Sequence, residues 1–411
     1  MSSRLRGVPG AWLALAGGAA LALAVGSGAA RACLWDSDTL AAEVRGRLDV
    51  LRVITGRFER NPPLYYSLRL ERVSARIASD PDDLEAYDDA GVACDRLGKG
   101  DEALDWMRRK AERLDAIEKA AQEKADPKLA ARAKEHRYRL LANRGTFLVH
   151  RWLRSGADRS KIDEVKAARD DIAAALAINP DAHFGREAVQ LRILEWIADP
   201  PAEKTDASGH RTTFLETQGR RLKHPGEDVK GLTGLVALGN AWESVDVFNA
   251  LARALAEEGQ RTSLVRMAQW RCEELIAGGK RSLLDGDSNV YLSDWMIRDE
   301  KALRETYRSL RAEAEAWQAK RTAYMVERLE EGRHPDTDRD FWSGFHDDGP
   351  PSIAQARVVP AARAVGRRVR LLDALLVLGF GGALTVLLVR LRQIRADRKA
   401  RTQPGVHWLG D

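Results

Sequence analysis

Close to its C-terminus the chain contains nineteen residues, 371–389, whose only charged side chain is Asp373 at the edge. An α-helix rises about 1.5 Å per residue, so this length matches the hydrocarbon core of a bilayer. A helix in a soluble core is seldom apolar on every side, and the flanking Arg370 and Arg390 are typical of membrane boundaries. We therefore predict one transmembrane helix at 371–389, which divides the rest of the chain between the two sides of a membrane.

The N-terminal residues 1–32 have the features of a secretory signal peptide. Arg4 and Arg6 form a basic start, an apolar run follows, and residues 30–32 (Ala-Arg-Ala) fit an A-x-A cleavage site. The apolar run is shorter than the roughly twenty residues that a spanning helix needs, and an uncleaved anchor is the alternative. Cleavage would make Cys33 the first residue. Its lipidation stays open, because the two residues before Ala32 depart from the usual lipobox.

The net charge of +5 is concentrated at the two ends of the chain. The segment up to Arg31 carries +3 and the part from Arg357 onward carries +8, so the stretch between them carries −6. Basic residues beside apolar segments fit membrane topology better than nucleic-acid binding, which needs a basic face on the folded domain, so we expect no nucleic-acid partner. An exported N-terminus would place the basic tail 390–411 in the cytoplasm and the folded part in the periplasm, as a single-pass protein of the cell membrane.

Between the two apolar segments the apolar residues recur at helical spacing and β-branched runs are scarce, which predicts an all-α protein. We divide this part into a helical region at 33–200 and a second one at 231–332. Residues 201–230 are rich in Pro, Gly, Lys and Thr, and we predict a linker or insertion there. Residues 333–370 have few apolar anchors, which favours a tether to the membrane.

The stretch 80–115 contains the residues of a helix hairpin with a close crossing. Gly91 has no Cβ to hold two helices apart, and Gly98 can supply a left-handed cap that ends the first helix. Pro81 suits a first helical turn. With Tyr87, Ala90, Ala103 and Met107 at the expected spacings, the stretch resembles a tetratricopeptide repeat (TPR); one departure is Lys110, where the family usually has Ala.

Two further copies are more divergent. One combines the glycine at 143–145 with a second-helix ending at 171–180, and another helix begins at 183–196. A third copy at 247–275 fits with one inserted residue after Gly259. Three repeats are near the minimum for a self-supporting array.

Three further stretches strengthen the resemblance: CLWDSDTL after the signal peptide, LDVLRVITGRFERNPPLYYSLRLERV and NPDAHFGRE. Together they are similar to a group of exported bacterial TPR proteins. The resemblance, over 33–275, implies an alpha solenoid whose concave face holds a protein or peptide.

A long helix is predicted from 298 to 331. One stripe of it is apolar at alternating four- and three-residue spacing, interrupted by Arg321, as in a heptad seam. The seam either covers the last repeat or joins two copies in a coiled coil. We favour the first arrangement, and hence a monomer, because the last repeat needs a capping helix. The seam residues are Leu303, Tyr307, Leu310, Ala314, Trp317 and Tyr324.

The motifs that could carry chemistry each fail a requirement. The segment 278–282 (GGKRS) lacks the first Gly and the Ser/Thr of a phosphate loop. The alternating aspartates at 336–340 followed by Asp347 are similar to a calcium loop, but Phe341 occupies the position of the turn glycine, so we expect a solvated acidic loop. We interpret His150 and His183 as packing residues. We therefore predict no catalytic residues, cofactor or metal.

The sequence thus predicts an all-α TPR-like array of helix pairs with one C-terminal transmembrane helix, acting as a scaffold for protein–protein interaction and not as an enzyme. The alternatives are a helical ligand-binding domain or enzyme with a site in the repeat groove, and a coiled-coil oligomeriser. A closed pocket of inward-pointing ionisable groups would favour the enzyme. An open groove with Asn, Arg and aromatic side chains would favour the scaffold.

Overall fold

The computed structural model describes residues 49–180, 185–200, 213–215, 222, 224–259, 262–283, 300–347 and 349. Within these ranges the secondary structure consists of helices without a strand, as the apolar spacing predicts. The expected signal peptide (1–32), transmembrane helix (371–389) and tail (390–411) lie outside the described residues. No helix within the described part is both long enough and apolar enough to span a membrane.

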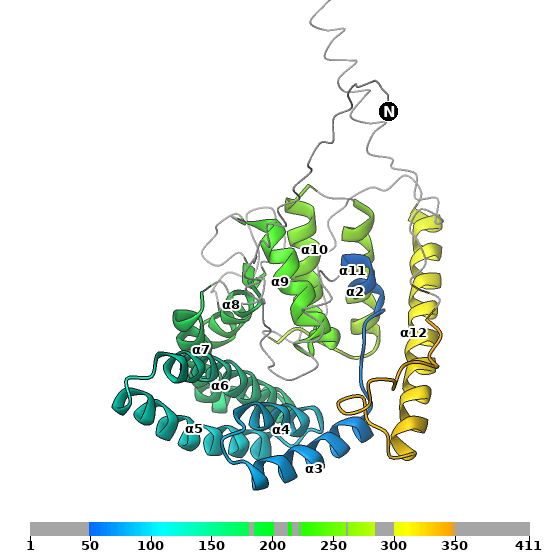
Figure 1. The fold of residues 1–411 in the computed structure, drawn as a ribbon. Helices are drawn as coiled ribbons and strands as arrows, with labels where there is room; N and C mark the ends of the chain where they lie inside the picture. Colours follow the sequence, from blue (N-terminus) through cyan, green and yellow to red (C-terminus); the bar gives the residue numbers. More distant parts are fainter. Residues whose placement is uncertain are drawn as a thin grey trace, which may run out of the picture.

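Eleven α-helices are described, most of them joined by short turns, and each longer helix packs on the next one in the chain (Figure 1). In chain order they are α2 (Val50–Thr55), α3 (Pro63–Ser79), α4 (Leu84–Arg96), α5 (Gly100–Glu123), α6 (Pro127–Arg154), α7 (Ile162–Ile178), α8 (Arg186–Ala198), α9 (Pro225–Ala237), α10 (Val245–Glu257), α11 (Thr262–Ala277) and α12 (Glu300–Glu330), with the 3-10 turns η1 (Arg159–Lys161) and η4 (Ala241–Glu243).

The predicted hairpin at 80–115 is formed by α4 and the first part of α5. Asp83 caps α4 by accepting a hydrogen bond from the Ala86 N–H. We expected Pro81 in the first turn of the helix, but it lies in the turn before α4. Gly98 follows α4 with φ +79°, as expected of a left-handed cap. A Cβ on Gly91 would lie 2.8 Å from Met107 Cε and 2.9 Å from Phe147 Cε2, so glycine is what allows α4 to approach α5 and α6.

The two divergent copies also correspond to helix pairs. Asp126 caps α6 through the N–H groups of Lys128 and Leu129, and α6 packs along α7. Gly145 lies at this contact, where an added Cβ would be 2.9 Å from the Ala168 carbonyl oxygen. The third copy corresponds to α10 and α11.

The prediction of a linker at 201–230 is wrong from Pro225 onward, because α9 begins there. Pro225 occupies the first helical turn and Glu227 and Asp228 follow, which are ordinary signals for a helix start. Its glycines serve packing: a Cβ on Gly231 would lie 2.7 Å from Val189 Cγ2 of α8. Gly231, which already belongs to the predicted second helical region, is therefore a contact point between α9 and α8.

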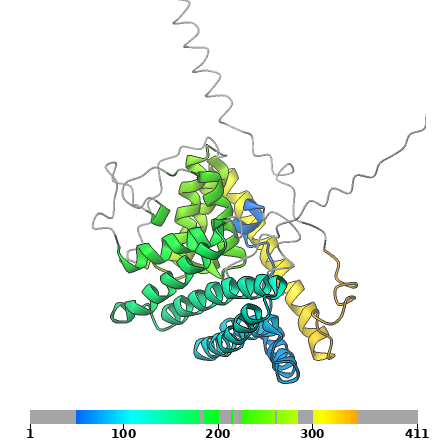
Figure 2. The same ribbon diagram turned by 60° about the vertical axis from the view of Figure 1, so that its left-hand side comes forward.

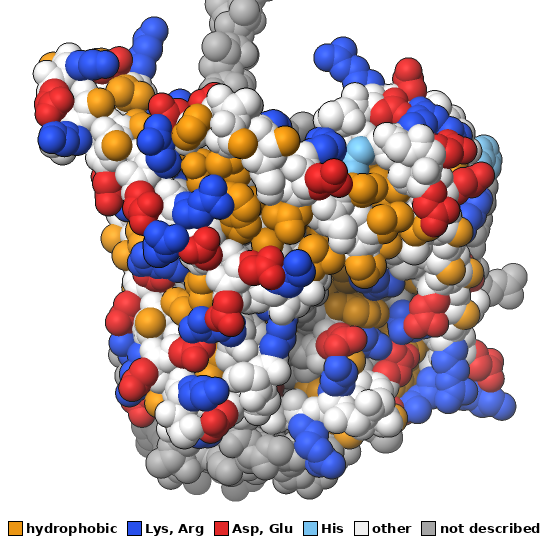
Figure 3. Space-filling model, turned by 90° about the horizontal axis from the view of Figure 1, so that it is seen from below, with side chains coloured by type: hydrophobic (Ala, Val, Ile, Leu, Met, Phe, Trp, Pro, Cys, Tyr) orange, Lys and Arg blue, Asp and Glu red, His pale blue; other side chains and the backbone are white. Residues whose placement is uncertain are grey.

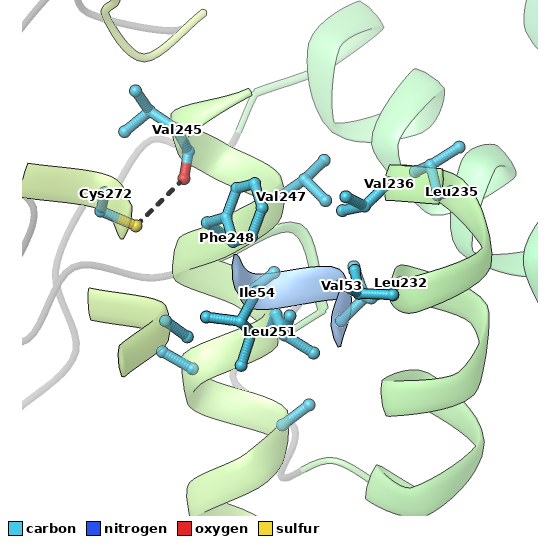
Figure 4. Close-up of a cluster of buried hydrophobic side chains, with 14 of the residues drawn as sticks. Val53, Ile54, Leu232, Leu235, Val236, Val245, Val247, Phe248, Leu251 and Cys272 are labelled. Atoms are coloured by element: carbon cyan, nitrogen blue, oxygen red, sulfur yellow. Dashed lines mark hydrogen bonds between the residues drawn. The ribbon is translucent and has the colours of Figure 1, made fainter. Parts of the chain in front are cut away.

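The expected two helical regions share one hydrophobic core. The short helix α2 lies among α9, α10 and α11, where Val53 and Ile54 are fully buried against Leu232 and Leu251 (Figure 4). The same cluster of buried side chains extends to Val189 and Leu194 of α8, from the N-terminal region. Residues 33–200 and 231–332 are therefore not separate folding units in this structure.

Helix α12 joins the two ends of the helix series, since it contacts α11 at one end of the series and α3 at the other, with α2 between (Figures 1 and 2). The predicted seam is buried inside this chain from Leu303 to Trp317. Beyond that it continues through Arg321, Met325 and Leu329, and not through the half-buried Tyr324 as we expected.

The prediction of a tether at 333–370 does not describe residues 333–347. After α12, Gly332 reverses the chain with φ +80°, and Phe341 becomes 1% exposed. Asp336 accepts hydrogen bonds from Arg69 of α3, at 2.9 Å from Nε and 2.6 Å from Nη2, and Arg69 is itself fully buried. This segment therefore fastens the end of α12 to α3; most of the remaining tether lies outside the described residues.

Candidate functional site

The glycine pair at 278–279 ends α11 and does not form a phosphate cradle. The N–H groups of Gly278, Gly279 and Lys280 bond to the carbonyl oxygens of the preceding helical turn. Lys280 pairs with Glu243. These three backbone N–H groups are thus already bonded and cannot bind a phosphate, and the sequence 278–282 also lacks residues that the phosphate-loop motif requires.

The acidic loop does not gather its carboxylates around one point. Asp338 pairs with Arg333, Asp347 with Arg57 and Asp336 with Arg69. The expectation of a solvated loop is wrong for the Asp336 side chain, which is 15% exposed. Burial acts to raise its pKa, but the hydrogen bonds and charge of Arg69 hold that pKa below the usual range. In the part of the chain that the structure describes, no group of His, Cys, Asp and Glu side chains is arranged to hold a metal.

His150 forms part of an ion-paired cluster between α4 and α6. Its Nδ1 lies 2.8 Å from Asp95 Oδ2, and Arg154 donates to both the carbonyl and the side chain of Asp95. Burial favours the neutral carboxyl, yet His150 and Arg154 lower the pKa of Asp95 below its ordinary value. Beside it, Arg96 donates to the Leu238 carbonyl at the end of α9, over 2.7 Å. The cluster therefore ties three helices together, while His183 lies outside the described residues.

The two described cysteines are buried, and burial raises the pKa of both thiols, that of Cys94 to about 11. Both are therefore protonated at neutral pH, when a thiol is a poor nucleophile. Cys33 lies outside the described residues.

A group of side chains that the sequence did not single out surrounds Trp242. Three guanidinium carbons lie near its ring centroid: Arg271 at 3.8 Å, Arg311 at 5.1 Å and Arg60 at 5.3 Å. Phe58 packs edge-on against the same ring at 5.4 Å. We call Phe58, Arg60, Trp242, Arg271 and Arg311 the Trp242 cluster.

Two of the three arginines have carboxylate partners. Glu274 accepts from Arg271 at 3.0 Å and from Arg311 at 3.1 Å, and Glu315 accepts from Arg311 at 2.6 Å. Arg271 also donates to the Trp242 carbonyl oxygen. These bonds orient Arg271 and Arg311 firmly along the indole.

Arg60 differs from its neighbours. Its main-chain N–H and carbonyl are bonded to Gln318, but within the described part of the chain its guanidinium has no bonded carboxylate. The Nη1 atom is buried without a hydrogen-bond partner. Burial, together with the charges of Arg311 and Arg271, lowers the pKa of Arg60 from 12.5 to about 10. This is a half-buried cation with an unused donor.

The cluster depends on how the chain leaves α2. Gly56 has φ +86°, and a Cβ there would lie 2.8 Å from Trp242 Cζ2, so only glycine fits both the turn and the contact. Residues 56–62 then run past Trp242 to α3. Because its members come from this segment, η4, α11 and α12, no local sequence pattern could have revealed the cluster.

Phe58 and Arg271 of the cluster are buried, whereas Arg60 and Trp242 are half-buried and the neighbouring side chains of Glu243 and Glu315 are 65% and 62% exposed. Elsewhere, a pocket of about 280 Å³ between α5, α6 and the end of α7 has a mixed lining of alanines, Ile178 and the polar Gln122 and Lys134. Its Arg137 is already paired with Glu118. Figure 3, which views the molecule from below, shows hydrophobic side chains around a hollowed middle, among charges of both signs.

Comparison of the chain with protein-family models, with curated proteins and with solved structures found no match.

Proposed function

We propose that this protein is a membrane-anchored TPR-like scaffold in the periplasm that binds another protein or a peptide, and that it is not an enzyme. The Trp242 cluster is the observation that carries the proposal. Trp and Arg are enriched among residues that dominate protein–protein binding energy. A half-buried indole flanked by ordered guanidiniums is an arrangement of that kind.

The serial packing of helix pairs supports the TPR part of the proposal. The hairpin α4–α5 has the close crossing at Gly91 and the left-handed cap at Gly98 that the resemblance implies. Arrays of this type bind extended partners on a continuous surface formed by successive repeats. The binding function itself is argued by analogy from such arrays.

Site-specific photo-crosslinking in cells tests the binding function. A photoreactive amino acid replaces Glu315, which lies beside the Trp242 cluster, or Lys119, which is 78% exposed on α5 and distant from it in the chain. We expect one discrete adduct from position 315 that position 119 does not give. The same adducts from both positions, or none from either, would contradict a binding surface at the cluster.

Reporter fusions test the anchor. A reporter that is active only outside the cytoplasm should be active when fused just before Arg367 and silent when fused at Asp411. The reverse pattern would show that the proposed orientation is wrong, without affecting the binding experiment.

A further inference from the structure

We propose that the Arg60 guanidinium binds the carboxylate of one acidic side chain of the protein partner, with the Trp242 ring beside it. This inference rests on the proposed binding function and specifies its chemistry. The geometry points to Arg60 because it is the cluster's cation that lacks a bonded carboxylate within the described chain.

The local charge balance favours a monoanion. The three arginines of the cluster face two carboxylates, Glu274 and Glu315, which leaves one positive charge uncompensated. A carboxylate brings one negative charge and can accept two parallel N–H bonds from a planar guanidinium. A phosphate at neutral pH would bring more charge than the cluster lacks.

The surroundings also favour a carboxylate carried on an apolar segment. Phe58 and the Trp242 ring border Arg60 and offer apolar contact, with centroid distances of 5.0 and 5.3 Å to its guanidinium carbon. The exposed Glu243 and Glu315 would repel a strongly acidic chain. The expected ligand is therefore a segment with one carboxylate among uncharged residues.

The position of Arg60 disfavours a purely structural role. It lies beside two like charges and is partly desolvated, so its charge costs stability in the unliganded protein. A cation kept in such a place is compensated when an anion binds. Substituting Arg60 should therefore impair binding without loss of stability.

The test uses the detergent-solubilised full chain and two fluorescently labelled pentapeptides, acetyl-Ser-Leu-Glu-Leu-Ser-amide and its Gln counterpart, with binding measured by fluorescence anisotropy. We expect the wild type to prefer the Glu peptide by about tenfold, as for a hydrogen bond to a charged group. Arg60→Gln should abolish the preference and leave the melting temperature unchanged or higher. The control Arg108→Gln, which removes an exposed arginine of α5, should keep the preference.

Five results would overturn the inference. Four of them are no preference in the wild type, a preference that survives Arg60→Gln, an equal loss in Arg108→Gln, and unfolding of Arg60→Gln, which would make Arg60 structural. Inorganic phosphate that displaces the Glu peptide at lower concentration than acetate would also overturn it, in favour of a phosphate site. If an adduct forms at position 315 while Arg60→Gln changes nothing, the proposed function stands and the carboxylate site fails. If peptide binding behaves as expected and no adduct forms in cells, Arg60 is a carboxylate site, but the proposed binding of a protein partner fails.

Discussion

Replacing Lys110 with Met should destabilise the protein by about 3–5 kcal/mol, because it leaves a buried carboxylate without its counterion. Lys110 is fully buried on α5, with Nζ 2.6 Å from Asp88 Oδ1 on α4, and Asp88 is 3% exposed. Asn143 of α6 donates to the same oxygen at 3.0 Å. After the substitution, only this one neutral donor would remain bonded to the Asp88 carboxylate.

A double-mutant cycle separates the ion pair from other effects of the substitution. In Lys110→Met with Asp88→Asn, the amide can still accept from Asn143 and no buried charge is left, so most of the lost stability should return. The matched control is Arg113–Asp82, which joins α5 to the turn before α4 at the same 2.6 Å but with side chains 43% and 55% exposed. Its coupling energy should stay below about 1 kcal/mol.

Urea unfolding of the fragment 33–362, followed by far-ultraviolet circular dichroism, measures each free energy of unfolding. A Lys110→Met variant that loses less than about 1 kcal/mol would refute the reasoning, as would equal coupling in the buried and the exposed pair. Either result would mean that water reaches Asp88 in solution.

Three more predictions follow from the same fragment. Gly91→Leu should cost about 3 kcal/mol or more, because the side chain would enter the contact with two neighbouring helices, and an unchanged melting temperature would argue against the repeat. In sedimentation at micromolar concentration the wild type should be a monomer that Leu310→Glu unfolds. A concentration-dependent dimer that Leu310→Glu abolishes with helicity intact would contradict this. Burial lowers the pKa of His136 below 6.5, so on acidification the unfolded chain takes up a proton before the folded chain does. The free energy of unfolding should therefore fall as the pH drops below about 6.5. In urea titrations at several pH values, His136→Gln should reduce this dependence on pH.

The local features of the fold could be predicted from sequence, because short spacings determine them. The hairpin of α4 and α5 follows from apolar spacing, Gly91 and Gly98. Lys110 looked like a departure from the repeat pattern. The structure explains it through Asp88, one helix away, which supplies the charge that a buried lysine needs. A departure of this kind is informative once its partner in space is known.

The long-range features could not be predicted from periodicity. Asp336 and Arg69 are separated by 267 residues, and the members of the Trp242 cluster come from four separate segments. The first turns of α9 were missed for another reason. Pro225 and Gly226 added to the loop-like composition of 201–230, although proline is also common in the first turn of a helix.

The packing of α12 against both ends of the helix series connects the long-range contacts with the proposed binding site. An open repeat array exposes an apolar face at each end and needs a cap on both. Here α12 contacts α11 and α3, and the Asp336–Arg69 pair fastens it, so the two ends are covered by one helix. The Trp242 cluster exists only in this closed arrangement, because Arg311 belongs to α12 and Arg60 to the segment between α2 and α3. If Arg60 binds a carboxylate as we propose, that binding and the packing of α12 should stabilise each other.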